Sequence, residues 1–216
     1  MMKHNYGVND YEKYSKDPEW KKLHKSVFPN YHQISETEFN SNEKITWIMS
    51  VVPNAEEKVA KRIVQSLEDY SCMAYKEIHE DKGAKLQQTR DILTVFDSVK
   101  TYPYKGTIYR GLYFDSWEDL VNVLSRGRGK WKEPSITSFS TDISIAENFA
   151  SRSQWGLVLI CKNNKSGIPF KHISKMAYED EILSPGAHRN KDWNLNVDSL
   201  HMDKEKKIVY VEIEEN

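Results

Sequence analysis

The sequence changes character at Thr107, from helical periodicity before it to short strand-like runs after it. Upstream, apolar residues recur at helical spacing and predict helices from about 55 to 69 and over 86–96. Downstream, β-branched and aromatic residues form short runs separated by turns, which predict strands. These runs are 107–110, 136–140, 156–161, 180–183 and 207–213. Helices first and strands later, without steady alternation, predict an α+β fold rather than a doubly wound parallel sheet.

Two further helices are expected between these strands. Ser116 and Ser144 each stand three residues ahead of an acid, Asp119 and Glu147, which is the spacing of a capping box at a helix start. Gly127 is the residue type that most often ends a helix, so the first of the two is expected to stop there.

The N-terminal part of the chain differs from the rest. It is polar and studded with aromatic residues, and Pro18 and Pro29 break any helix there into short pieces. We therefore predict a helical N-terminal extension over residues 1–53 and one main domain over residues 54–216.

Composition limits the class of protein. Of the 216 residues, 38% are hydrophobic and 12% aromatic, which is enough for one core and excludes wholesale disorder. The net charge of -1 creates no overall attraction to nucleic acid or to an anionic membrane, so any binding must be local. Two cysteines cannot form a disulfide scaffold, and Cys161 ends an apolar run in which a buried thiol is expected. No apolar run is long enough to span a bilayer and no apolar leader is visible, so we expect a cytoplasmic protein without a signal peptide.

Several common site motifs are absent from the sequence. The nine glycines form neither a dinucleotide-binding turn nor a phosphate-binding Walker loop, so any nucleotide must be held differently. The seven histidines show no zinc-binding spacing, and we expect no metal site. The nucleophile elbow of the α/β-hydrolases is also missing.

The stretch Glu179-Asp180-Glu181 is the most informative segment. In a strand, residues two apart share a face, so Glu179 and Glu181 are expected to project together at roughly 6.5–7 Å while Asp180 points away. Two carboxylates facing one cleft suit a reaction in which positive charge develops on a ribose. The alternative is an edge strand with solvated acids, which needs no function.

Two other strands carry polar groups that complement this pair. Arg110 places a permanent cation at the end of a short strand, beside Gly111, and this combination suits a diphosphate and a planar amide. Ser140 ends a second strand and can orient a glutamate by a hydrogen bond. Taken singly, each is also ordinary strand sequence.

In their order along the chain, the three segments resemble the arginine–serine–glutamate class of mono-ADP-ribosyltransferases. That family has an aromatic-Arg pair on one strand, Ser-Thr-Ser on a second and Glu/Gln-x-Glu on a third. Here these positions read Tyr109-Arg110, Ser140-Thr141-Asp142 and Glu179-Asp180-Glu181. The resemblance covers about residues 66–214. It implies a split β-sandwich catalytic core over 54–216 and NAD as the source of the transferred group.

The resemblance also implies roles for single residues. Arg110 and Arg152 would contact the NAD phosphates, the Gly111 backbone would pair with the nicotinamide amide, and Phe149 would pack on the nicotinamide ring. The catalytic set would be Arg110, Ser140, Glu179 and Glu181, with Ser140 orienting Glu181 and Glu181 holding the ribose hydroxyl. The sequence departs from the family at Asp142, where a second serine is usual and where an acid can cap the helix that contains Ser144.

Weaker assignments follow from the same resemblance. Tyr70 and Tyr75 match a helical tyrosine motif at the wall of the NAD site, although two tyrosines at this spacing also suit a core. The stretch 165–178 corresponds to the acceptor-recognition loop, with Met176 and Tyr178 as its expected contacts.

The acceptor stays open at this stage. Glutamate at position 179 implies, by the family rule, a macromolecular acceptor with a protein arginine favoured, while family members acting on nucleobases or nucleic acid make that a second alternative. Residues 126–132 hold four bases and one aromatic residue, which suits RNA but is more often a solvated loop.

Other functional interpretations of the same residues also stay open. An NAD glycohydrolase would pass the group to water, and a binding module would keep the fold without turnover. A toxin or phage effector role, with an antitoxin or immunity partner, follows only from the class, and the oligomeric state is not determined.

Overall fold

The computed structural model describes residues 40–72, 74–98, 104–170, 172–174 and 180–216. Its helices are α3 (Ser41–Val51), α4 (Glu57–Cys72), α5 (Tyr75–Glu80), α6 (Gln87–Ser98), α7 (Trp117–Arg126) and α8 (Ile143–Ala150), with a short 3-10 helix η3 (Gly186–Arg189). Its strands are β1 (Ile108–Phe114), β2 (Lys130–Trp131), β3 (Thr137–Ser140), β4 (Trp155–Cys161), β5 (Ile168–Pro169), β6 (Glu181–Ser184), β7 (Trp193–Asp203) and β8 (Ile208–Glu215). Helices thus precede strands, and the expected α+β class is confirmed.

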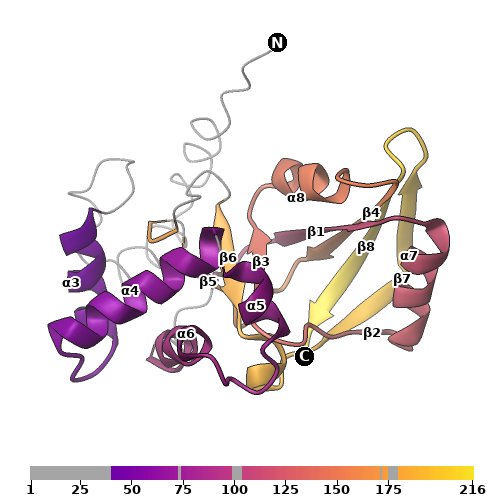
Figure 1. The fold of residues 1–216 in the computed structure, drawn as a ribbon. Coiled ribbons are helices and arrows are strands. Elements are labelled where there is room, and N and C mark those ends of the chain that lie inside the picture. Colours follow the sequence, from indigo (N-terminus) through magenta and orange to yellow (C-terminus); the bar gives the residue numbers. More distant parts are fainter. Residues whose placement is uncertain (1–39, 73, 99–103, 171, 175–179) are drawn as a thin grey trace, which may run out of the picture.

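The first helices form a layer of their own. Figure 1 shows α3, α4 and α6 gathered on one side of the molecule, with the long strands on the other side and β3, β5 and β6 between them. One apolar cluster joins these helices to the short strands, with Ile48, Ile63 and Ile92 packed against Ile136 and Leu183. The helices expected over 55–69 and 86–96 are α4 and α6.

Helix α3 lies within the stretch that we assigned to an N-terminal extension. Asn40 caps it by accepting hydrogen bonds from Asn42 N at 3.0 Å and Glu43 N at 3.1 Å. Its Trp47 and Ile48 belong to the same apolar cluster as α4. Residues 1–39 lie outside the described residues, so the division of the chain at residue 53 stays a prediction.

The strands form one eight-stranded sheet that narrows to a single joint. Their order is β2-β7-β8-β4-β1-β3-β6-β5, and only the β4–β8 pair is parallel. Strand β1 pairs with β4 over seven residues but with β3 at one registered pair, Tyr109 with Ser140. The sheet therefore splits into two halves at this joint, as in the expected split β-sandwich.

Helices α7 and α8 cover opposite faces of the larger half of the sheet. On β4, Leu157 and Leu159 pack in the cluster that contains Leu120 of α7, whereas Val158 packs with Ala146 of α8. Neighbouring residues of a strand point to opposite faces, so one buried strand serves both helices. This explains why residues 156–161 read as a continuous apolar run.

The expected strands are present, but the longest strand was not anticipated. Strand β7 spans eleven residues and pairs with β8, with an irregular register between Asn196 and His201. Its apolar and polar residues do alternate, over Trp193–Asp198 and again, one position out of phase, over Leu200–Asp203, so the strand signal was present and was overlooked. The strand expected over residues 180–183 lies one residue later in the chain, since β6 is Glu181–Ser184.

The two capping predictions had different outcomes. Ser116 caps α7 as expected, accepting a hydrogen bond from Asp119 N at 3.1 Å, and Gly127 follows the helix as its C-cap. At α8 the capping box based on Ser144 was wrong. Asp142 is the N-cap and accepts from Ser144 N at 2.8 Å, because its carboxylate stands where the first free N–H groups point.

Cys161 is buried, as expected from its apolar run. Burial, together with the nearby charge of Glu215, raises the pKa of this thiol to about 11. The thiol is therefore protonated and unreactive near neutral pH. Within the described residues, every helix is too short or too polar to traverse a lipid bilayer.

Candidate active site

A cavity of about 590 Å³ lies where the two halves of the sheet separate. Its walls come from the joint between β1 and β3, the start of β6, helix α8 and the tyrosines of α4 and α5. Eight residues that the sequence singled out line it: Tyr70, Tyr75, Arg110, Gly111, Ser140, Phe149, Arg152 and Glu181. Segments separated by more than a hundred residues therefore meet in one cavity.

Strand register brings the three motifs together. Tyr109 is paired with Ser140 across β1 and β3, and Ser140 is paired with Glu181 across β3 and β6. Directly opposed residues in antiparallel strands have Cβ atoms about 4.5–5.5 Å apart, so the serine and the glutamate are neighbours. Arg110, Ser140 and Glu181 are each no more than 6% exposed.

Arg110 is held by groups behind the cavity. Its Nε lies 2.7 Å from Oε1 of Glu133, and its Nη1 donates a hydrogen bond to the Ser138 carbonyl at 2.8 Å. Burial alone would lower the pKa of Arg110, but the charge of Glu133 and the nearby tyrosines outweigh it and the pKa is raised. The guanidinium is therefore a fixed positive charge at the cavity wall.

The two tyrosines form an aromatic wall. Their rings meet edge to face at 5.8 Å, Tyr70 being buried while Tyr75 is 41% exposed. Burial, together with the charge of Glu181, raises the pKa of Tyr70 well above its usual value, so its hydroxyl stays protonated. Ser138 lies close enough to that hydroxyl to act as its hydrogen-bond partner. The two alternatives for Tyr70 are thus compatible, since it lies in the core and also lines the cavity.

Helix α8 supplies the opposite wall. The Arg152 guanidinium lies 3.7 Å from the centre of the Phe149 ring, a cation–π contact that fixes both side chains at the cavity. The Ser140 hydroxyl accepts a hydrogen bond from Asp142 N at 3.0 Å, so the serine is tied to the residue that caps this helix. The acid at position 142 therefore acts on the helix start.

Gly111 is needed for helix α8 to lie this close to β1. A Cβ atom on Gly111 would fall 1.8 Å from the Ala146 carbonyl oxygen and 2.9 Å from Cβ of Phe149. Only a residue without a side chain permits that approach. This packing requirement adds to the access that the glycine was expected to give to a ligand.

Gly111→Ala should lower the free energy of unfolding by about 1–3 kcal/mol, because the added methyl group overpacks the contact with α8. We also expect weaker NAD binding, since Phe149 lies on α8 and Arg152 follows directly after the C-cap of that helix. Chemical denaturation and NAD titration of the same sample check both effects. Gly83→Ala is the control, since its Cβ would meet only a lysine side chain, at 3.5 Å or more. Equal stability of the two variants would contradict the prediction.

Three predicted site residues, Met176, Tyr178 and Glu179, lie outside the described residues. Asp180 is described and has a φ of 45°, in the left-handed region, and β6 starts only at Glu181. The backbone at Asp180 is therefore not that of a regular strand. The expected spacing of the two carboxylates has no support from strand geometry, and the position of Glu179 stays a prediction.

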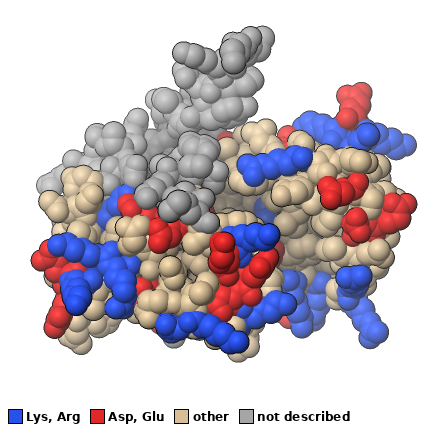
Figure 2. Space-filling view, viewed as in Figure 1, with Lys and Arg blue, Asp and Glu red and all other residues tan. Residues whose placement is uncertain are grey.

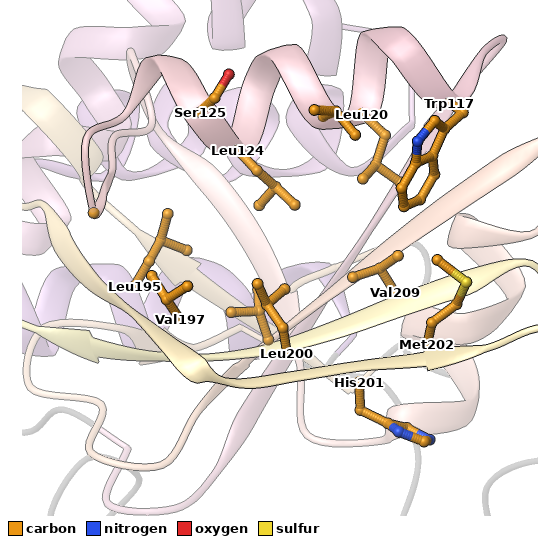
Figure 3. Close-up of a pocket in the computed structure, with 13 residues that line it drawn as sticks. Trp117, Leu120, Leu124, Ser125, Leu195, Val197, Leu200, His201, Met202 and Val209 are labelled. Carbon is orange, nitrogen blue, oxygen red and sulfur yellow. The ribbon is translucent and has the colours of Figure 1, made fainter.

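A second cavity, of about 510 Å³, lies between α7 and strands β7 and β8. Figure 3 shows Leu120 and Leu124 of α7 above the sheet and Leu195, Leu200 and Val209 below them. His201 is the one titratable residue among those that line it, and in Figure 3 its ring points away from the space between helix and sheet. This cavity is apolar and lacks an acid or base directed into it, so the first cavity is the candidate active site.

The basic segment 126–132 does not line the candidate active site. Gly129 lies at the edge of the apolar cavity, and Lys130 pairs with Asp192 at 3.2 Å. Figure 2 shows basic and acidic side chains interspersed over the face that it displays. The proposal that this segment recognises RNA stays a prediction.

Sequence reasoning missed Glu133 and the Ser138 carbonyl, which hold Arg110 from behind. Glu133 lies in the loop between β2 and β3, and only its burial beside Arg110 marks it. No sequence pattern distinguishes it from other acids. Within the described residues, no three His, Cys, Asp or Glu side chains gather as metal ligands would.

No family model matches the sequence, and no curated protein matches it. Solved structures do match. The Vis toxin, an ADP-ribosyltransferase from Vibrio splendidus, superposes with a TM-score of 0.55 at 19% identity over 86% of this chain and 90% of that one. Exoenzyme S from Pseudomonas aeruginosa gives 0.55 at 14% identity over 90% and 87%. An ADP-ribosyltransferase from Clostridium botulinum gives 0.53 at 16% identity over 84% and 98%. The chain therefore has the fold of bacterial ADP-ribosyltransferase toxins.

Proposed function

We propose that this protein is an NAD-dependent mono-ADP-ribosyltransferase that breaks the bond between nicotinamide and ribose. The observation that carries the proposal is the convergence of Arg110, Ser140 and Glu181, through strand register, on one cavity of an ADP-ribosyltransferase fold. A similar fold alone does not establish an activity, and the donor groups within the cavity supply the second argument.

The residues of the cavity fit NAD. Its volume falls within the range of about 300–1,000 Å³ that is usual for small-molecule sites. Arg110 presents a guanidinium, which suits a diphosphate, and Phe149 presents a ring to a planar amide. Tyr70 and Tyr75 supply an aromatic wall on which a planar ring of the ligand can pack. Exoenzyme S, one of the structural neighbours, is bound to carba-NAD in its structure.

Each of these side chains has a separate role in the proposed reaction. NAD supplies a glycosidic bond whose cleavage leaves positive charge on the ribose. Glu181 accepts a hydrogen bond from a ribose hydroxyl and stabilises that charge, which is worth more in a buried site than in water. Ser140, its partner across β3 and β6, orients the carboxylate, and Arg110 holds the diphosphate in place. Arg152, just after the end of α8, adds a second phosphate contact.

For the acceptor we propose an arginine guanidinium of a target protein, with Glu179 positioning or deprotonating it. The support is the Glu-x-Glu sequence, together with a structure of the Vis toxin in complex with agmatine, which carries a guanidinium. Met176 and Tyr178 are the proposed acceptor contacts. A role as a toxin or effector, acting in a cytoplasm and opposed by an immunity partner, is part of the same proposal.

The test supplies the purified chain with NAD labelled in the adenylate group, first with agmatine and then with cell lysate. We expect a labelled agmatine adduct and label on lysate protein that protease removes and nuclease does not. Glu181→Gln serves as the inactive control. Label found only as free ADP-ribose would indicate an NAD glycohydrolase, and nuclease-sensitive label would indicate a nucleic-acid acceptor. If no nicotinamide is released under any of these conditions, the proposal fails.

A further inference from the structure

Glu133 is a buried acid that stands behind the candidate active site without lining it. Its side chain is 4% exposed, and it is absent from the wall of the cavity that Arg110 helps to form. It therefore cannot touch a ligand in that cavity. Any effect that it has on NAD must pass through Arg110, whose Nε lies 2.7 Å from its Oε1.

Contacts from several elements hold the Glu133 carboxylate in place. Its Oε1 also accepts a hydrogen bond from Trp131 Nε1 at 2.9 Å, and Trp131 is itself buried in the core of the larger half of the sheet. The Glu133 carbonyl accepts from Ala187 N at 3.0 Å, which fixes the backbone as well. The acid is thus a rigid support, which a loop residue without such contacts would not be.

Glu133 also contacts a residue that supports the aromatic wall of the cavity. Its Oε2 lies 3.7 Å from His79 Nε2, and the His79 ring stacks on Tyr75 with centroids 5.7 Å apart. Tyr75 belongs to the aromatic wall, whereas Arg110 belongs to strand β1. One carboxylate therefore contacts the guanidinium and also the histidine that stacks on the aromatic wall.

The charge of Glu133 would weaken anion binding if charge alone mattered. Paired with it, Arg110 presents less net positive charge to a diphosphate than an unpaired guanidinium would. The orientation of the guanidinium then matters for binding. It has five N–H donors in one plane, and the contact of its Nη1 with the Ser138 carbonyl helps to fix that plane. Burial of an unpaired guanidinium would also be costly, and the pair removes that cost.

We infer that Glu133 is a positioning residue, which aims the Arg110 guanidinium at the diphosphate of NAD and keeps it buried in that orientation. The inference rests on the proposed function for the identity of the ligand. The geometric part, that Glu133 determines the orientation of Arg110, does not depend on turnover.

Kinetics of nicotinamide release from NAD by Glu133→Gln test the inference. The diphosphate contact exists both before and during bond cleavage, so its loss should raise KM about tenfold or more and change kcat less. If Glu133 only balanced charge, removing its charge would leave KM unchanged or lower it, and that result would overturn the inference. Glu215→Gln is the matched control, because Glu215 is a buried, ion-paired glutamate outside the cavity. Its KM should equal that of the unmodified chain.

Glu133→Asp covers the case in which the glutamine variant does not fold. Aspartate keeps the buried charge paired but moves the carboxylate back by one methylene, so we expect a folded protein whose KM is still raised several-fold. A folded aspartate variant with unchanged KM would show that the position of the carboxylate is unimportant, which also contradicts the inference.

A spectroscopic readout separates this inference from the proposed function. The Arg110 Nε–H signal in a ¹⁵N spectrum should shift in Glu133→Gln, and titration with inorganic pyrophosphate should require about tenfold more ligand than in the unmodified chain. If the unmodified chain releases no nicotinamide but this shift is seen, the proposed function fails and the positioning role stands. If nicotinamide is released while the signal and the titration are unchanged in the variant, the positioning role fails.

Discussion

Glu181→Gln is expected to lower kcat for nicotinamide release by about a hundred- to thousandfold, with KM for NAD almost unchanged. The amide keeps the size and some of the hydrogen bonding of the carboxylate but loses the negative charge that faces the ribose as the bond breaks. The site is buried, with Glu181 5% exposed, so water cannot replace that charge. Initial rates over a range of NAD concentrations measure both constants.

The matched control is again Glu215→Gln, a glutamate with no exposed surface on β8 that takes no part in the cavity. Thermal unfolding of both variants shows whether each is folded. A folded Glu181→Gln protein that retains more than about a tenth of the original kcat would contradict the assignment of Glu181 as the residue that stabilises ribose charge.

Arg110→Ala should have the largest effect on stability, lowering the free energy of unfolding by about 3–5 kcal/mol. The alanine leaves the Glu133 carboxylate buried, 3% exposed, without its cation, and an uncompensated buried charge is strongly destabilising. The same change removes the proposed diphosphate contact, so NAD binding should be lost. Urea denaturation and NAD titration of the folded fraction measure the two effects.

Arg189→Ala provides the comparison for an ion pair at the surface. Arg189 pairs with Asp97, and both side chains are at least 33% exposed, so Arg189→Ala should lower the free energy of unfolding by no more than about 1 kcal/mol.

Removing Glu133 together with Arg110 should lower the free energy of unfolding by less than the sum of the two single changes, because the double variant leaves no buried charge unpaired. Equal destabilisation by Arg110→Ala and Arg189→Ala would show that the buried pair is not coupled.

Local sequence predicted most of the regular elements, because their signals are local. Helices α4 and α6 have an apolar face at helical spacing, and β8 is a short run rich in β-branched residues. Strand β7 was missed although it alternates apolar and polar residues, because the alternation changes phase between Asn196 and His201, where the register with β8 also shifts. Ser144 and Asp142 were both expected as caps of α8, and the structure has Asp142, because only the path of the chain after β3 selects between them.

The chemistry of the site was readable from the order of Arg110, Ser140 and Glu181, and the structure brings these residues to one cavity. Nothing in the sequence pointed to Glu133, since a buried acid and an exposed acid look alike in a chain. The pattern also suggested a regular strand through Glu179, whereas the backbone turns into the left-handed region at Asp180.

By itself, then, the sequence determined which side chains with suitable chemistry are available and which short segments carry them, because residue type and periodicity are properties of neighbouring residues. Only the tertiary structure decided that Arg110 is supported from behind by Glu133, that α8 rests on Gly111, and that the cavity opens at the single pair joining β1 to β3. These features depend on burial and on contacts between distant segments, which exist only once the chain has folded.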